Sequence, residues 1–163
     1  SGQHVLDEEY YKRIEAIQFT MNHDDGNQTE NIIDSDIILV GVSRTSKTPT
    51  SIYLANKGLK ISNIPLVNDM KIPEDIIKSN SLCVIGLFTE AERLFDIRRN
   101  RLSSLKERET TEYTDLDKIR AEVEQSKKIF KKNRWPVIDV TRKSVEETAA
   151  SIIKIFEIKN KNA

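Results

Sequence analysis

A chain of 163 residues with 37% apolar and 32% charged residues is long enough for one domain with a sizeable core and too apolar to be disordered. The 26 basic and 26 acidic side chains cancel, so we expect no nucleic-acid partner, and any anion site must be local. One cysteine and two histidines make a structural zinc site improbable, and no apolar run approaches the ~20 residues of a membrane span. The start has no signal-peptide pattern, so these features predict a cytoplasmic protein with no membrane association.

The first 34 residues are predicted to form a helix followed by an acidic loop. Ile14, Ile17 and Met21 recur at helical spacing within residues 7–21, which predicts an amphipathic helix buried along that face. The polar residues 23–27 that follow have turn chemistry. We therefore treat residues 1–34 as a segment that leads into a main domain formed by residues 35–163.

Strands and helices are predicted to alternate from residue 36 onward. Cys83, in one of the apolar runs, is predicted to be a buried structural thiol rather than a catalytic one. The alternation predicts an α/β fold with a mostly parallel sheet flanked by helices. The predicted strands cover residues 36–40, 61–67, 82–88 and 136–140, and the predicted helices cover residues 49–57, about 90–105 after a Thr89 N-cap, 114–133, and the closing segment after a Ser144–Glu147 capping box.

The turn between the first predicted strand and the next helix has the pattern of a phosphate-binding loop. The general pattern is G-x-x-x-x-G-K-[ST], and this segment matches it at Gly41, Lys47 and Thr48 but has Ser46 at the second glycine. Such a turn directs backbone N–H groups and a helix N-terminus at an anion. The alternative is a solvated turn that happens to be basic and rich in hydroxyl groups. The predicted P-loop-like nucleotide-binding residues are Gly41, Val42, Ser43, Arg44, Thr45, Ser46, Lys47 and Thr48.

Individual side chains of this loop have distinct predicted roles. Lys47 could reach an outer phosphate, and the Thr48 hydroxyl could bind Mg²⁺. Arg44 adds a second cation whose fork of donors suits a phosphate.

Two other groups of charged residues could take part in chemistry. The adjacent carboxylates Asp24 and Asp25 could hold Mg²⁺ or act as a general base, or they could form an exposed acidic turn. Arg98 and Arg101 are three residues apart on a predicted helix, so they share a face that could clamp a phosphate or a partner's acidic surface, or be solvated. Arg93, on the same helix, points elsewhere.

The order of these motifs resembles the kinase–pyrophosphorylase regulatory proteins of bacteria and plants, which regulate pyruvate, phosphate dikinase or phosphoenolpyruvate synthase. The resemblance spans nearly the whole chain. It is carried by the run DIILVGVSRTSKTPTS at residues 36–51 and by residues 23–26, 53–55, 86–87, 92–94, 97–98, 135–139 and 144–149.

The resemblance implies a bifunctional enzyme. One activity uses ADP to phosphorylate a threonine of the target enzyme and inactivate it. The other uses inorganic phosphate to remove that phosphate, which releases pyrophosphate and restores activity. The family protein is longer at its N-terminus, so the chain corresponds to a C-terminal nucleotide-binding domain, and the activity of that domain alone stays open.

The resemblance also implies ligands and roles for residues in this chain. The ligands are ADP, inorganic phosphate and Mg²⁺, with residues 41–48 as the ADP-binding loop in which Ser46 stands in for glycine. Asp25, with Asp24 beside it, is expected to be the base or a metal-orienting group. Lys47, Arg44 and Arg98 are expected to neutralise charge during phosphate transfer.

The implied partner is pyruvate, phosphate dikinase, with phosphoenolpyruvate synthase as the alternative target, and a homodimer is a further expectation. Two other classes of function stay open at this point. One is a non-catalytic ADP-sensing module, which would keep its function after Asp25→Ala. The other is an ordinary ATP-dependent small-molecule kinase, which would prefer ATP to ADP.

Overall fold

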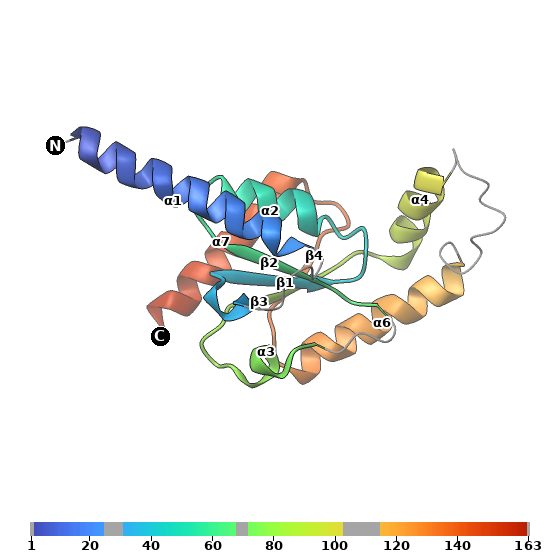
Figure 1. Cartoon of the computed structure of the whole chain (residues 1–163). Coiled ribbons are helices and arrows are strands. Elements are labelled where there is room, and N and C mark those ends of the chain that lie inside the picture. The colour runs from blue at the N-terminus through green and yellow to red at the C-terminus, as the bar shows by residue number, and fades with distance from the viewer. Residues whose placement is uncertain (1, 25–30, 68–71, 103–114, 163) are drawn as a thin grey trace.

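The fold is built around a four-stranded sheet. The computed structural model describes residues 2–24, 31–67, 72–102 and 115–162. Within it, the strand order is β2-β1-β3-β4 and all three pairings are parallel (Figure 1). This confirms the predicted α/β class. The strands are β1 (Ile37–Gly41), β2 (Ile61–Pro65), β3 (Val84–Phe88) and β4 (Val137–Asp139).

Helices cover both faces of the sheet (Figure 1). Ile37 and Leu39 of β1 pack in a cluster with residues of α2 and α7, whereas Ile38 and Val40 pack in a cluster with residues of α3 and α6. β1 is therefore buried on both faces, which explains its continuous apolar sequence. The helices are α1 (Gly2–Asn22), α2 (Lys47–Ala55), α3 (Glu74–Lys78), α4 (Ala91–Leu102), α6 (Leu116–Lys132) and α7 (Val145–Lys161), with a short 3₁₀ helix η2 (Ile32–Asp34).

A smaller cluster joins α4 and α6 beyond the carboxyl end of the sheet. Leu94 of α4 packs with Ile119 and Val123 of α6, and Val42, directly after β1, belongs to the same cluster. The segment after β1 is therefore in contact with two helices that come much later in the chain.

The buried face of α1 matches the predicted one only in part. Ile17 is half-buried, but Ile14 and Met21 are 36% and 65% exposed, whereas Ala16 and Thr20 are buried. The Thr20 hydroxyl accepts a hydrogen bond from the backbone N–H of Ile61 at 3.1 Å, which ties α1 to β2. Small residues four apart allow a helix to approach its neighbours closely, and apolar spacing alone does not reveal that face.

The predicted helix starts have mixed outcomes. The Ser144–Glu147 capping box is present, and Asp115 caps α6 through the N–H groups of Asp117 and Lys118. The prediction that Thr89 caps α4 is wrong, because α4 begins at Ala91 and its first carbonyl acceptor is that of Glu90. The predicted end of this helix, residues 103–105, lies outside the described residues.

Candidate phosphate-binding site

The loop formed by residues 41–48, called here the phosphate loop, lies where the connections of the sheet change direction. From β1 the chain crosses through α2 to β2 on one side, while β3 lies on the other side of β1. In parallel sheets, the crevice at the carboxyl ends of two strands that diverge in this way is the usual ligand site. The predicted loop therefore lies at the position where this fold class binds ligands.

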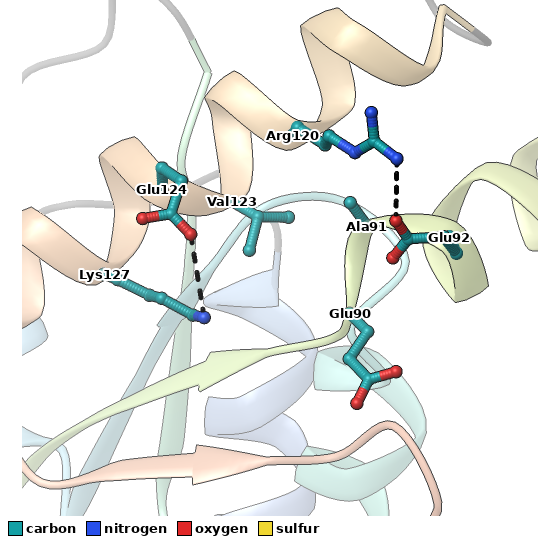
Figure 2. Close-up of a pocket in the computed structure, with 7 residues that line it drawn as sticks. All are labelled: Glu90, Ala91, Glu92, Arg120, Val123, Glu124 and Lys127. Carbon is teal, nitrogen blue, oxygen red and sulfur yellow. Dashed lines mark hydrogen bonds and ion pairs between the residues drawn. The ribbon is translucent and has the colours of Figure 1, made fainter.

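A pocket with a volume of about 300 Å³ lies near the same end of the sheet, between the start of α4 and the middle of α6 (Figure 2). Arg120 pairs with Glu92 at 3.0 Å, and Lys127 pairs with Glu124 at 3.8 Å. The pKa of Glu92 lies below its ordinary value because its carboxylate accepts a hydrogen bond from its own backbone N–H and another from Arg120. Both cations that line this pocket are therefore paired with carboxylates. It is lined by Glu90, Ala91, Glu92, Arg120, Val123, Glu124 and Lys127.

The backbone of the phosphate loop follows an unusual path. A Cβ atom on Gly41 would lie 2.6 Å from the carbonyl oxygen of Leu87 in β3, so the first position of the loop requires glycine. Arg44 and Ser46 have φ angles of 69° and 63°, in the left-handed region that favours glycine. Ser46 is the residue at the second glycine of the general pattern, and its φ angle explains why glycine is usual there.

The loop leaves several backbone donors for a ligand. Within the described part of the chain, no backbone carbonyl accepts a hydrogen bond from the N–H groups of residues 43–46. Ser46 is the N-cap of α2 and forms no side-chain cap. Backbone N–H groups of such a turn at a helix N-terminus favour the binding of an anion.

Lys47 is folded inside the phosphate loop. It is 5% exposed, and its Nζ donates to the carbonyl oxygen of Val42 at 2.7 Å and to Oγ1 of Thr45 at 3.3 Å. The Thr45 hydroxyl donates to the same Val42 carbonyl at 2.8 Å. The loop therefore holds one positive charge against its own backbone.

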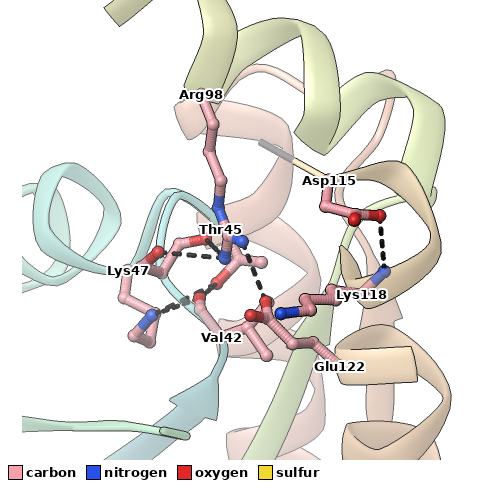
Figure 3. A network of polar contacts seen from close by, with 8 residues as sticks. Val42, Thr45, Lys47, Arg98, Asp115, Lys118 and Glu122 are labelled. Atoms are coloured by element: carbon pink, nitrogen blue, oxygen red, sulfur yellow. Dashed lines mark hydrogen bonds and ion pairs between the residues drawn. The ribbon is translucent and has the colours of Figure 1, made fainter. Parts of the chain in front are cut away.

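Arg98 brings a second positive charge to the loop from α4. It is 2% exposed and points into the loop, where Nη2 donates to Oγ of Ser43 at 3.1 Å (Figure 3). Its Nη1 forms an ion pair with Oε2 of Glu122 in α6 at 2.9 Å. Arg93 is exposed, and the side chain of Arg101 lies outside the described residues. Sequence reasoning did not identify Glu122, because nothing in the order of residues indicates that α6 passes behind Arg98.

Asp24 meets the other end of the phosphate loop. Its Oδ1 accepts hydrogen bonds from the hydroxyl of Thr48 at 2.9 Å and from Nδ2 of Asn63 at 2.6 Å. Sequence reasoning identified Asp24 and Thr48 separately but missed Asn63. The available signal was a lone amide in the apolar run of β2. Asp25, the other predicted carboxylate, lies outside the described residues.

The sequence was also compared with known proteins and family models. A family model described as kinase/pyrophosphorylase matches residues 1–153. A protein of Pelagibacter ubique with the provisional name pyruvate, phosphate dikinase regulatory protein is similar to this chain, with 66% identity over 163 residues. That alignment covers 99% of this chain and 59% of the relative.

Proteins of Erythrobacter litoralis and Anaplasma marginale carry the same provisional name. They are 54% identical over 153 residues and 52% identical over 157 residues, respectively. The alignments cover 94% and 96% of this chain, but 55% and 56% of those relatives. The chain thus spans less than two thirds of the length of these relatives. In the part of the chain that the structure describes, no helix combines the length and apolar content needed to cross a membrane.

Proposed function

Because the chain belongs to the kinase/pyrophosphorylase family, we propose that its phosphate loop binds ADP and transfers phosphate to and from a protein threonine. The names of the relatives support pyruvate, phosphate dikinase as the target protein, with phosphoenolpyruvate synthase as the alternative. The observation that carries the proposal is the convergence of Lys47, Arg98 and the Asp24–Thr48 pair on one loop at the switch point of the sheet.

Lys47 and Arg98 are the proposed partners of the phosphate groups. Both are almost fully buried, and a buried cation is costly unless a charged or strongly polar group faces it. A phosphate oxygen is a stronger acceptor than the Val42 carbonyl that Lys47 contacts, so the ammonium group would exchange one for the other. Arg44 is exposed at the same loop and would add its charge from the solvent side.

The residues at the start of α2 fit Mg²⁺. The Thr48 hydroxyl and the Asp24 carboxylate are adjacent oxygen donors, and Mg²⁺ is usually held by one or two carboxylates together with a hydroxyl, water and phosphate oxygens. Among the described residues, no three His, Cys, Asp or Glu side chains gather into a group that could hold a metal ion. We therefore do not propose a site whose protein ligands are all carboxylates. Bound there, Mg²⁺ would supply positive charge to the phosphate oxygens during transfer.

The proposed reactions are two phosphoryl transfers. In one, the threonine hydroxyl of the target attacks the β-phosphorus of ADP, the bond to the α-phosphate oxygen breaks, AMP leaves and a base takes the hydroxyl proton. In the other, an oxygen of inorganic phosphate attacks the phosphorus of the phosphothreonine. The bond from that phosphorus to the threonine oxygen breaks, the threonine oxygen regains a proton, and pyrophosphate leaves. Lys47 and Arg98 would stabilise the charge that develops in both transfers.

The two carboxylates have different proposed roles. Asp24 already accepts hydrogen bonds from Thr48 and Asn63, which suits a group that orients a metal rather than one that collects a proton. Asp25 is proposed as the general base.

The test is calorimetric titration of the protein with ADP and Mg²⁺, compared with ATP, in the wild type and in Lys47→Ala. We expect saturable ADP binding that is weaker by about tenfold or more in Lys47→Ala, because a charge-assisted contact to phosphate is lost. Lys57→Ala, which removes an exposed lysine from the residues that follow α2, is the matched control and should bind like the wild type. Unchanged affinity in Lys47→Ala, stronger binding of ATP than of ADP, or no ADP binding by the wild type would each contradict the proposal.

A further inference from the structure

Asn63 is a polar side chain in an interior position where this fold normally places an apolar one. It is 1% exposed, it stands opposite Leu39 of β1 in the sheet register, and it is followed by the buried Ile64. Its Oδ1 is buried and accepts no hydrogen bond among the described residues. Burying an amide with one unsatisfied oxygen costs stability, so packing alone does not account for asparagine at this position.

The side-chain hydrogen bonds of Asn63 lead to α2 and to the segment that meets the phosphate loop. Its Nδ2 donates to Oδ1 of Asp24 at 2.6 Å and to Oγ of Ser51 at 3.0 Å, and Ser51 in turn donates to the carbonyl oxygen of Thr48 at 2.9 Å. Its backbone N–H donates to the carbonyl oxygen of His23 at 3.0 Å. Asn63 therefore holds residues 23–24 through both backbone and side chain, and it links them to the first turn of α2.

These contacts also determine which way the amide faces. If the amide were rotated by half a turn, its oxygen would face the Asp24 carboxylate, and two acceptors would meet at 2.6 Å. The donor groups must therefore point at Asp24 and Ser51. In this orientation Asn63 donates to Oδ1 of Asp24, while Oδ2 of Asp24 accepts a longer hydrogen bond from the Thr48 hydroxyl at 3.2 Å.

We propose that Asn63 is a positioning residue that holds the Asp24 carboxylate against Thr48, so that Mg²⁺ strengthens nucleotide binding at the phosphate loop. The inference rests on the proposed function, because it assigns Asn63 a role in that same site. A neutral donor suits this role. An aspartate would place a second carboxylate against Asp24, and an aliphatic side chain would leave Asp24 without the shortest of its hydrogen bonds to described residues.

The test is the gain in ADP affinity that Mg²⁺ produces, measured by calorimetry in EDTA and in Mg²⁺. Asn63→Leu is close in volume but has no donor. We expect its metal-free ADP affinity to stay within about twofold of the wild type, because the contacts of Lys47 are intact, while the Mg²⁺-dependent gain falls by about tenfold. Asn63→Thr, a better strand former, should show the same selective loss if Asn63→Leu does not fold.

Ser62→Ala is the matched control. Ser62 is a buried polar residue of the same strand, but its hydroxyl contacts Ser35 at 2.6 Å rather than the phosphate loop. We expect this variant to keep the full Mg²⁺-dependent gain even if it is less stable. A loss of the same size in Ser62→Ala would show that any damage to β2 has this effect and would overturn the role of Asn63.

A second readout needs no variant of Asn63. The side-chain amide resonance of Asn63 in a ¹⁵N-labelled wild-type protein should shift in Asp24→Asn and should stay in place in Ser62→Ala. The inference would be overturned by an amide resonance that is unaffected by Asp24→Asn. It would also be overturned by a full Mg²⁺-dependent gain in ADP affinity in folded Asn63→Leu. In both cases, ADP binding by the wild type would leave the proposed function standing. No ADP binding by the wild type in either buffer would overturn the proposed function, and this inference with it.

Discussion

Ser46 and Arg44 show how single residues shape the phosphate loop. Both adopt a left-handed backbone, which costs an ordinary residue roughly 1–2 kcal/mol relative to glycine. Ser46 directly precedes Lys47, so the same backbone turn that strains the serine also begins α2 and places the lysine inside the loop. Strain of this kind persists where the surrounding structure over-determines the conformation, as it does at functional sites.

We expect Ser46→Gly to raise the free energy of unfolding by up to about 1 kcal/mol. Glycine removes the steric cost of the left-handed backbone but loses more conformational entropy on folding, so the net gain is smaller than the full cost. Urea denaturation measures the change. Ser151→Gly within α7 is the control and should lower stability by roughly 0.5–1 kcal/mol, because the backbone there is helical. If both substitutions destabilise equally, the left-handed conformation of Ser46 is wrong.

Cys83 is the predicted buried thiol, and its burial has a consequence for alkaline stability. It is 4% exposed, and burial raises the pKa of its thiol from 9.0 to about 11, with Lys159 acting weakly in the opposite direction. The folded state therefore binds the proton more tightly than the unfolded state. This contribution is complete below pH 9 and is lost as the pH rises towards 11.

We expect the wild type to lose about 1.4 kcal/mol more stability than Cys83→Ala between pH 7.5 and pH 10, because one pKa unit corresponds to about 1.4 kcal/mol. The measurement is urea denaturation of both proteins at both pH values. Taking the difference between the two proteins removes the effect of other groups that titrate in this range. Identical pH dependence in the two proteins would mean that the thiol is not desolvated in the folded state.

At the scale of elements, the contact between β3 and α6 is unusually close. A Cβ atom on Gly86 would lie 2.6 Å from ring atoms of Phe130, a fully buried side chain of α6. The aromatic ring thus packs directly on the strand backbone. This contact fixes the position of α6 relative to β3, and Glu122, two turns earlier in α6, meets Arg98.

We expect Gly86→Ala to destabilise the fold by about 1–3 kcal/mol, because the ring or the strand must shift to admit the methyl group. Addition of Phe130→Leu should recover part of that loss, since the smaller side chain leaves room, although Phe130→Leu alone should be destabilising. Thermal and urea unfolding of the four proteins gives the coupling between the two sites. Strict additivity would argue against direct contact between the ring and the strand.

The whole molecule brings four distant segments to the phosphate loop. Asp24 arrives from the end of α1, Asn63 is placed by β2, and Arg98 arrives from α4 with Glu122 of α6 behind it. Val42 joins the cluster between α4 and α6, so the loop is packed as well as hydrogen-bonded. The loop is therefore held by the tertiary structure on both sides.

We expect Arg98→Lys to weaken ADP binding by about tenfold and to destabilise the fold by roughly 1–3 kcal/mol. A lysine keeps the charge but cannot contact Ser43 and Glu122 with the planar fork of donors that arginine provides. Calorimetry and urea denaturation measure the two effects. Arg93→Lys, an exposed position on the same helix, should leave both quantities within experimental error. Wild-type behaviour of Arg98→Lys would mean that the geometry of the guanidinium group is not needed.

The amino-acid sequence determined the features that depend on local order. Alternating apolar runs and helical segments predicted the parallel α/β sheet, and Gly41, Lys47 and Thr48 identified the loop, because a strand, a turn and a helix that follow one another are read from neighbouring residues. The capping box at Ser144 was likewise a matter of spacing.

Only the tertiary structure decided which distant residues meet. It brought Asp24 to Thr48 and Arg98 to Ser43. It buried Ala16 and Thr20 of α1 rather than Ile14 and Met21. It also gave Asn63 and Glu122 partners that no sequence motif predicts. The physical reason is that these contacts join residues 24 to 55 positions apart. Their formation depends on the crossing of helices over the sheet and on close packing, and neither is encoded by the spacing of residues along the chain.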